Sequence, residues 1–257
     1  MENSWNLKEK KALVTGGTKG IGKATVIELL KLGADVLFSA RHENEVNTLE
    51  TELSSQFPKA TIKGMKADVT SPSDRQKIAN WIEHNFQTLD ILVNNAGINI
   101  RKTALDYSEE EYRKIIEINL VAPFEVSRIL YPFLKKSGKA SVINLGSVAG
   151  SQDVNSGVPY AMTKGGINQQ TRSLATEWAK DNIRVNTVSP WYTKTPLTEA
   201  VFENKEKLEN ILLRTPLGRI ADAEEMAAVI AFLAMDKSSY LTGQNITVDG
   251  GMSVSVF

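Results

Sequence analysis

Three residues with the right chemistry for proton transfer occur close together in the second half of the chain. Tyr160 and Lys164 are four positions apart, and Ser147 lies upstream in the segment NLGSVAG. On a helix, Tyr160 and Lys164 share one face. A tyrosine alone has a reference pKa of about 10, and a nearby ammonium group stabilises its phenolate form. The spacing therefore predicts a proton donor for a carbonyl oxygen, with the Ser147 hydroxyl holding that oxygen. An exposed tyrosine and lysine without a chemical role would be the alternative.

The amino-terminal segment KALVTGGTKGIGKATVIELLKLGADVLFSAR has the pattern of a strand, a glycine-rich turn, a helix and a second strand. Glycine permits a tight turn, and the free amides and dipole of a helix start favour a phosphate. The glycines fall as GGxxGxG and not as GxGxxG, so the interpretation depends on the flanking strand and helix. We expect this turn to bind a dinucleotide through Gly16, Thr18, Lys19, Gly20, Ile21 and Gly22.

The end of the second expected strand indicates which nicotinamide cofactor is bound. An acidic residue there would bind a ribose 2′-hydroxyl and repel a 2′-phosphate, but the chain has Ser39, Ala40 and Arg41 instead. Arg41 and Lys19 offer two cations for the phosphate, and Ser39 offers a hydroxyl. We therefore predict NADP(H) over NAD(H). The alternative is that both cations are solvated surface residues.

Several further motifs occur in a fixed order: TGGTKGIG at 15–22, Asp68 in KADV, NNAG at 94–97, Asn119 in INL, Ser147, YAMTK at 160–164 and TGQNITVDGG at 242–251. With them the chain resembles the short-chain dehydrogenases and reductases over nearly its whole length. The resemblance implies a catalytic tetrad of Asn119, Ser147, Tyr160 and Lys164. In it, Asn119 helps to hold a water that links Lys164 to a proton relay, and Lys164 also holds the nicotinamide ribose. Further implied cofactor contacts are Asp68 and Val69 beside the adenine, Asn95, Ala96 and Gly97 along the cleft, and Pro190 and Thr195.

Within that family the chain is similar to the tropinone reductase-like group, in the segments SLATEWAKDNIRVN at 173–186 and SPWYTKTPL at 189–197. Most relatives have glycine where this chain has Trp191. The indole therefore either forms a wall of the substrate pocket or packs in the core. We expect Ser147, Tyr160, Trp191 and Tyr192 to contact the substrate.

Composition excludes several other classes. The 257 residues carry 30 basic and 30 acidic side chains, so the formal net charge is zero and neither nucleic acid nor an anionic membrane is an expected partner. There is no cysteine, and the two histidines belong to no ligand pattern, so no metal site is predicted. The opening residues lack the apolar core of a signal peptide, which makes a cytoplasmic location the default expectation.

The apolar runs predict an α/β fold: a doubly wound Rossmann fold with a seven-stranded parallel sheet and helices on both faces. We expect one domain over 1–257, with a pair of short helices at 196–216 as a substrate lid, in which Leu212 and Leu213 serve packing. Ser71 and the Ser108/Glu111 pair predict two helix starts. The strands are expected at Lys11–Val14, Asp35–Ser39, Thr61–Ala67, Leu89–Asn94, Ala140–Leu145, Arg184–Val188 and Asn245–Val248.

These features predict an NADPH-dependent reductase of a small, lipophilic or cyclic ketone, reversible as alcohol oxidation. A 3-oxoacyl thioester reductase and a sugar or polyol dehydrogenase are alternatives, and a cofactor sensor without catalysis is a further one. The resemblance also implies a dimer or tetramer formed through long helices at 109–136 and 160–180. Ile167, Leu174 and Trp178 could serve either the core or such an interface.

Overall fold

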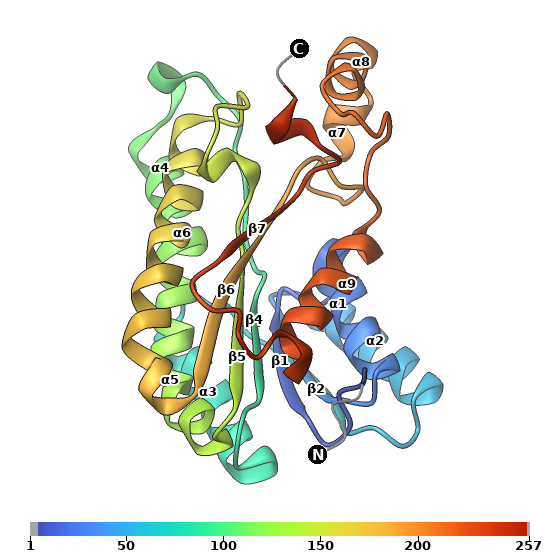
Figure 1. The fold of residues 1–257 in the computed structure, drawn as a ribbon, viewed down its shortest axis with the longest axis vertical. Coiled ribbons are helices and arrows are strands. Elements are labelled where there is room, and N and C mark those ends of the chain that lie inside the picture. The colour runs from blue at the N-terminus through green and yellow to red at the C-terminus, as the bar shows by residue number, and fades with distance from the viewer. Residues whose placement is uncertain (1–4, 256–257) are drawn as a thin grey trace.

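The computed structural model describes residues 5–255, which contain one seven-stranded sheet (Figure 1). All neighbouring strands are parallel, in the order β3-β2-β1-β4-β5-β6-β7. The strands are β1 (Lys11–Thr15), β2 (Asp35–Ala40), β3 (Ile62–Lys66), β4 (Ile91–Asn94), β5 (Ala140–Leu145), β6 (Ile183–Pro190) and β7 (Asn245–Val248). This confirms the predicted doubly wound Rossmann fold. The strand order reverses between β1 and β4, and open parallel sheets bind ligands at such a switch point.

Helices cover both faces of the sheet. Buried side chains of α1 (Gly20–Lys31), α2 (Glu43–Gln56) and α9 (Ala223–Ala234) form one core layer, and those of α3 (Pro72–Trp81), α5 (Ala122–Ser137) and α6 (Val158–Trp178) form the other. Figure 1 shows the two groups on opposite sides of the strands. The central strands β1, β4 and β5 are buried almost throughout, which explains why their sequences are apolar runs and do not alternate.

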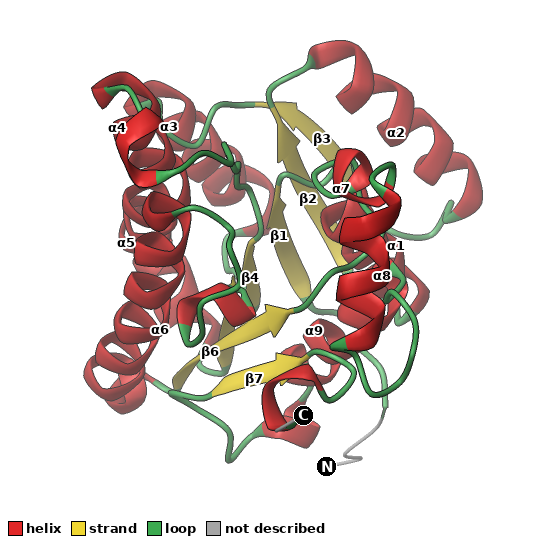
Figure 2. Ribbon diagram, turned by 90° about the horizontal axis from the view of Figure 1, so that it is seen from above, coloured by secondary structure: helices red, strands yellow, loops and turns green. Residues whose placement is uncertain are grey.

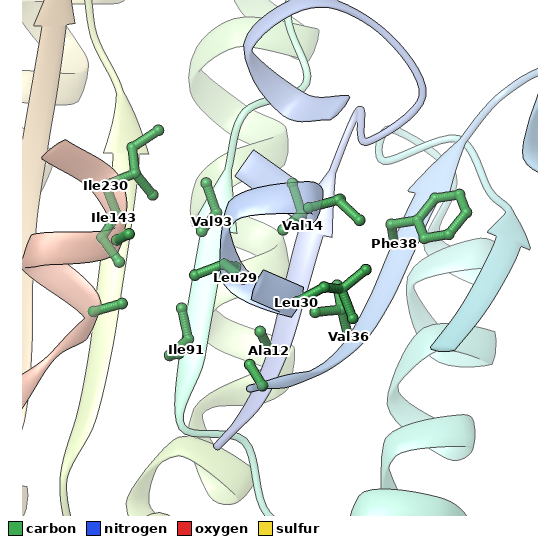
Figure 3. Close-up of a cluster of buried hydrophobic side chains, with 14 of the residues drawn as sticks. Ala12, Val14, Leu29, Leu30, Val36, Phe38, Ile91, Val93, Ile143 and Ile230 are labelled. Atoms are coloured by element: carbon green, nitrogen blue, oxygen red, sulfur yellow. The ribbon is translucent and has the colours of Figure 1, made fainter. Parts of the chain in front are cut away.

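The first core layer is made of branched aliphatic side chains (Figure 3). Val14 of β1 and Val36 of β2 lie beside Leu30 of α1, and Ile143 of β5 lies near Ile230 of α9. All five are at most 3% exposed. This packing fixes α1 against the sheet, and with it the glycine turn that precedes α1.

Both predicted helix starts are confirmed. The Ser71 hydroxyl accepts a hydrogen bond from the Asp74 amide at the start of α3. Before α4 (Glu109–Ile116), Ser108 and Glu111 form a reciprocal capping box.

The long helix expected at 109–136 is interrupted by a π-helical turn. Helix α4 leads into the π turn Glu117–Val121, which contains Asn119, and α5 continues from it. A π turn inserts one residue into the helix and re-aims its neighbours, and such turns are frequent at functional sites. On α6, Ile167, Leu174 and Trp178 are buried within the chain, so they serve the core.

The expected pair of short helices at 196–216 is present as α7 (Glu199–Phe202) and α8 (Lys205–Leu213). It stands at the top of Figure 1, above α9 and α1, and Figure 2 shows it from above, in front of those helices. Val201 and Ile211 are its buried apolar residues, whereas Leu213 is 81% exposed. The expectation that Leu213 serves packing is therefore wrong. Its side chain falls on the outer face of α8, opposite to the face that Ile211 buries.

Candidate active site

A cavity of about 520 Å³ lies at the carboxyl ends of the strands. Its walls come from the segments that follow β1, β2, β3, β4, β5 and β6, together with the start of α6. Pockets of this size accommodate small ligands and cofactors. Chain segments far apart in the sequence thus meet around one space.

The glycine turn after β1 has the shape that a phosphate needs. Gly16 and Gly20 have positive φ angles of 66° and 52°. A Cβ atom on Gly22 would lie 2.1 Å from the Gly16 carbonyl oxygen, so only glycine fits there. Lys19 precedes α1 without any side-chain cap, which leaves the first amides of α1 available to an anion. The turn therefore fits the pyrophosphate of a dinucleotide.

The NNAG segment after β4 holds this turn in place. The Asn95 side-chain amide donates hydrogen bonds to the Thr15 and Gly16 carbonyl oxygens, each 2.9 Å long. In return, the Thr15 hydroxyl accepts from the backbone amides of Asn95 and Ala96. Asn95 thus reinforces the turn as well as lining the cavity beside Ala96 and Gly97.

The end of β2 holds a mixed set of charges. Arg41 is exposed and lines the cavity, and no described carboxylate forms an ion pair with it. Lys19 pairs with Glu45 at 2.8 Å, and the hydrogen bond from Lys19 lowers the pKa of that carboxyl. Glu45 was not anticipated from the sequence, because it belongs to the first turn of α2 and not to the strand end.

Ser39 does not reach this corner, which corrects the expectation that it offers a hydroxyl there. Strand β2 continues to Ala40, so Ser39 still lies within the sheet, paired with Thr15 and Met65. Side chains alternate along a strand, and that of Ser39 is fully buried and lines no part of the cavity.

Asp68 and Val69 line the cavity after β3. The Asp68 carboxylate accepts hydrogen bonds from the amide and the hydroxyl of Thr70. The Val69 carbonyl accepts one from the Arg75 guanidinium. These bonds fix the loop in which both residues lie.

Ser147, Tyr160 and Lys164 come together on the other side of the cavity. Ser147 opens a short 3₁₀ turn after β5, and its hydroxyl accepts from the Ala149 amide at 3.2 Å. Tyr160 and Lys164 lie on the first two turns of α6, and the Lys164 Nζ is 5.5 Å from the centre of the Tyr160 ring. That Nζ donates to the Leu145 carbonyl oxygen at 2.6 Å.

The electrostatics of this group differ from the simple expectation. Burial raises the pKa of Tyr160, while the Ser147 hydroxyl and the Arg101 charge lower it. The buried Lys164 ammonium donates to the Leu145 carbonyl oxygen. Burial lowers the pKa of Lys164 to about 8.

Asn119 does not line the cavity. Its side-chain amide donates to the Ile98 carbonyl oxygen at 2.8 Å, and its Oδ1 accepts from the Ile98 amide at 2.9 Å. Both polar groups of this buried side chain are thus used on one backbone residue of the loop after β4. Asn119 is placed to position that loop.

Trp191 lines the cavity and does not pack in the core, because it is partly exposed and belongs to neither core layer. Its ring lines the cavity and packs edge-on against Tyr192, with centroids 4.6 Å apart. Its indole nitrogen donates to the Thr215 hydroxyl. Tyr192 also contacts Phe202 of α7, at a centroid distance of 6.1 Å. An aromatic row therefore joins the cavity wall to the helical pair.

Most of the predicted site residues line this one cavity: Gly16, Thr18, Lys19, Gly20, Ile21, Arg41, Asp68, Val69, Asn95, Ala96, Gly97, Ser147, Tyr160, Lys164, Pro190, Trp191, Tyr192 and Thr195. Gly22, Ser39 and Asn119 do not. Arg101 and Leu197 also line it and were not predicted. No motif marks Arg101, and Leu197 ends the segment SPWYTKTPL without having been named as a site residue. The positions of both depend on how two loops fold over the cavity. Among residues 5–255, no cluster of three potential ligand side chains suited to a metal ion is found. Within the same residues, no helix is long and apolar enough to span a membrane.

Comparisons with known proteins agree with this geometry. A family model described as enoyl-(acyl carrier protein) reductase matches residues 16–253. A tropinone reductase homolog from Arabidopsis thaliana is 45% identical over 100% of this chain and 97% of its own length. A second homolog from that plant, described as chloroplastic, is 44% identical over 98% of this chain and 78% of its length. The crystal structure of a gluconate 5-dehydrogenase from Burkholderia cenocepacia, in complex with NADP and tartrate, superposes with a TM-score of 0.94 at 28% identity, covering 99% of both chains.

Fold, site and comparisons define an oxidoreductase that acts on alcohol or carbonyl groups and uses a nucleotide cofactor. The chain belongs to the short-chain dehydrogenase/reductase family.

Proposed function

We propose that this protein is an NADPH-dependent reductase of a small ketone that is lipophilic or cyclic, with alcohol oxidation as the reverse reaction. The observation that carries the proposal is the meeting of Ser147, Tyr160 and Lys164 in the cavity that the glycine turn also lines. A protein that only senses the cofactor has no need of a proton donor at this place.

In the proposed mechanism, the Tyr160 phenol donates its proton to the carbonyl oxygen of the substrate. The Ser147 hydroxyl donates a hydrogen bond to the same oxygen and stabilises the negative charge that develops on it. Lys164 supplies a positive charge beside the Tyr160 ring and would hold the ribose next to the nicotinamide. Asn119 acts indirectly by fixing the Ile98 loop. The nicotinamide cofactor supplies the hydride when it is bound.

The proposed preference for NADP(H) rests on Arg41, which is exposed at the cavity and has no carboxylate partner among the described residues. Lys19 is a second cation at this corner, although Glu45 now neutralises it. A 2′-phosphate offers both cations a stronger acceptor. The gluconate 5-dehydrogenase structure, which contains NADP, is consistent with this choice.

The proposed substrate class rests on the wall formed by Trp191 and Tyr192 and on the likeness to tropinone reductase homologs. Helices α7 and α8 would act as the lid of this pocket within a single domain.

A sugar-acid dehydrogenase is the second candidate, favoured by the likeness to gluconate 5-dehydrogenases. We also propose a homo-oligomer, since Phe124 of α5 and Met162 of α6 are 40% and 59% exposed on the helices that would pair. The cytoplasmic location stays a prediction from the sequence.

The test is the loss of NADPH absorbance with small aliphatic ketones, cyclic ketones, keto sugar acids and 3-oxoacyl esters, run in parallel with NADH. Turnover of cyclic ketones with NADPH in preference to NADH supports the proposal. Turnover of keto sugar acids alone would favour the second candidate. Tight NADPH binding without turnover of any compound would contradict a catalytic role.

A further inference from the structure

The substrate side of the cavity contains an unpaired cation. The acidic side chains that line the cavity, Glu45 and Asp68, both belong to the segments that follow β2 and β3. On the side of Ser147 and Tyr160, the charged lining residues are Lys164, which is buried under the tyrosine, and Arg101. No carboxylate of residues 5–255 forms an ion pair with Arg101. Its charge nevertheless acts on the reacting group, since it lowers the pKa of Tyr160.

The loop that carries Arg101 is held at several points. Asn119 binds both backbone groups of Ile98. The Asn99 side chain donates to the Ser156 carbonyl oxygen at 3.1 Å. The Tyr107 hydroxyl donates to the Ile100 carbonyl and accepts from the Lys102 amide. The backbone on both sides of Arg101 is therefore fixed, and its exposed side chain lines the cavity from this loop.

The present partner of the guanidinium is weak. Arg101 Nη1 donates to the Leu197 carbonyl oxygen at 3.3 Å, at the start of the segment that leads into α7. A neutral carbonyl at this distance uses little of the capacity of a guanidinium, which prefers a carboxylate bound through two parallel hydrogen bonds.

On the basis of the proposed reductase function, we propose that Arg101 binds an anionic group of the substrate, so that the natural substrate is a ketone or secondary alcohol that also carries a carboxylate. The anionic group exchanges with the Leu197 carbonyl as partner of the guanidinium, while the ketone oxygen faces Ser147 and Tyr160. Repulsion by Arg101 disfavours a ketone that carries a protonated amine. Arg101 thereby determines specificity, whereas Ser147 and Tyr160 carry out the reaction.

The test compares cyclic ketones that differ in charge. The anionic probes are 3- and 4-oxocyclohexanecarboxylate, the neutral probes are their methyl esters, and the cationic probe is N-methyl-4-piperidone. For each, kcat/KM is measured at saturating NADPH, and binding to the NADP-loaded protein is measured by calorimetry. We expect at least one acid to be preferred over its ester by about 10- to 100-fold, the range for a hydrogen bond to a charged group, and the cation to be the poorest substrate.

Arg101→Gln should remove this preference while turnover of the esters continues. The variant also loses a charge near Tyr160, so the pH dependence of its kcat/KM is recorded. A change in the pKa of Tyr160 would affect the acid and the ester alike and would leave their ratio unchanged. Lys102→Gln is the matched control: it removes a cation from the same loop, and Lys102 pairs with Glu111 and lines no part of the cavity. It should keep the preference of the wild type.

Equal use of acids and esters by the wild type, or an undiminished preference for acids in Arg101→Gln, would overturn the assignment of Arg101. Turnover of the esters would still support the proposed reductase function in that case. If the acids bind to the wild type but not to Arg101→Gln, and no probe is reduced, the result supports the anion site and contradicts the proposed reductase function. If no acid binds, the anion site is refuted.

Discussion

The two halves of the cavity are built in different ways. The cofactor half uses backbone geometry: glycines at 16, 20 and 22, the free amides of α1, and loops that Asn95 and Asp68 tie down. The substrate half uses side chains from distant segments, namely Arg101, Ser147, Tyr160, Trp191 and Tyr192. The first half accommodates a constant part of a cofactor, and the second can vary without disturbing the sheet. The class of reaction can therefore be predicted from the sequence, whereas the identity of the substrate cannot.

The sharpest separation of the two halves should come from Tyr160→Phe. Loss of a general acid lowers kcat by about 100- to 10,000-fold, while the glycine turn that binds the cofactor is untouched. We expect kcat to fall within that range and the Kd of NADPH, measured by fluorescence, to change little. Tyr131→Phe is the matched control, since its hydroxyl bonds to Asp181 outside the cavity. Near-normal turnover in Tyr160→Phe would refute the assignment of the proton donor.

The cofactor half should fail selectively in Gly22→Ala. The new Cβ would collide with the Gly16 carbonyl and with Asn95, and overpacking of this kind costs about 1–3 kcal/mol. The Kd of NADPH should rise and the free energy of unfolding should fall by an amount in that range. Gly165→Ala is the control, because its φ is not positive, the nearest atom lies 3.5 Å from its Cβ position and it lines no part of the cavity. Unchanged NADPH affinity in Gly22→Ala would contradict the role of the turn.

Within the cofactor half, Arg41 should decide between the two nicotinamide cofactors. Arg41→Gln removes a charge-assisted hydrogen bond to the 2′-phosphate, so the ratio of kcat/KM for NADPH over NADH should fall by about 10- to 100-fold. Glu45→Gln should move the ratio in the opposite direction, because it releases Lys19. A ratio that neither substitution changes would show that the corner does not contact the phosphate.

The smallest expected effect concerns pH. Lys164 has its pKa lowered to about 8 by burial, so it loses its positive charge as the pH rises through that value. The kcat/KM for NADPH, which reports the free protein, should be constant below this pH and fall by about tenfold per unit above it. In Tyr160→Phe the Kd of NADPH should rise over the same pH range. The titrating group is Lys164, which this variant keeps. A profile that is flat to pH 10 would contradict the assignment.

Local patterns were sufficient for the fold. The seven strands, the two helix starts at Ser71 and Ser108 and the helical pair after β6 follow from apolar periodicity and capping residues, which act over a few positions. The strand ends differ from the predicted ends by up to two residues, as for β6, which runs to Pro190. The cofactor turn was equally predictable, because each glycine is required by the backbone at its own position.

The remaining features depend on tertiary placement. The side chain of Ser39 is near the corner in sequence but points into the core. Asn119 lies in a π turn that no apolar period predicts, and its contact with Ile98 joins two separate segments. Arg101 and Glu45 enter the cavity only because a loop and a helix fold towards it. Such placements require the packed structure.

The most direct test of the central claim is the transfer of deuterium from 4-deuterated NADPH to a cyclic ketone, with each deuterium epimer tried separately and the alcohol analysed by mass spectrometry. The account predicts that one epimer delivers a single deuterium to the carbinol carbon with the wild type, and that Tyr160→Phe forms almost no alcohol. Alcohol without the label from either epimer, or labelled alcohol formed equally well by Tyr160→Phe, would contradict it.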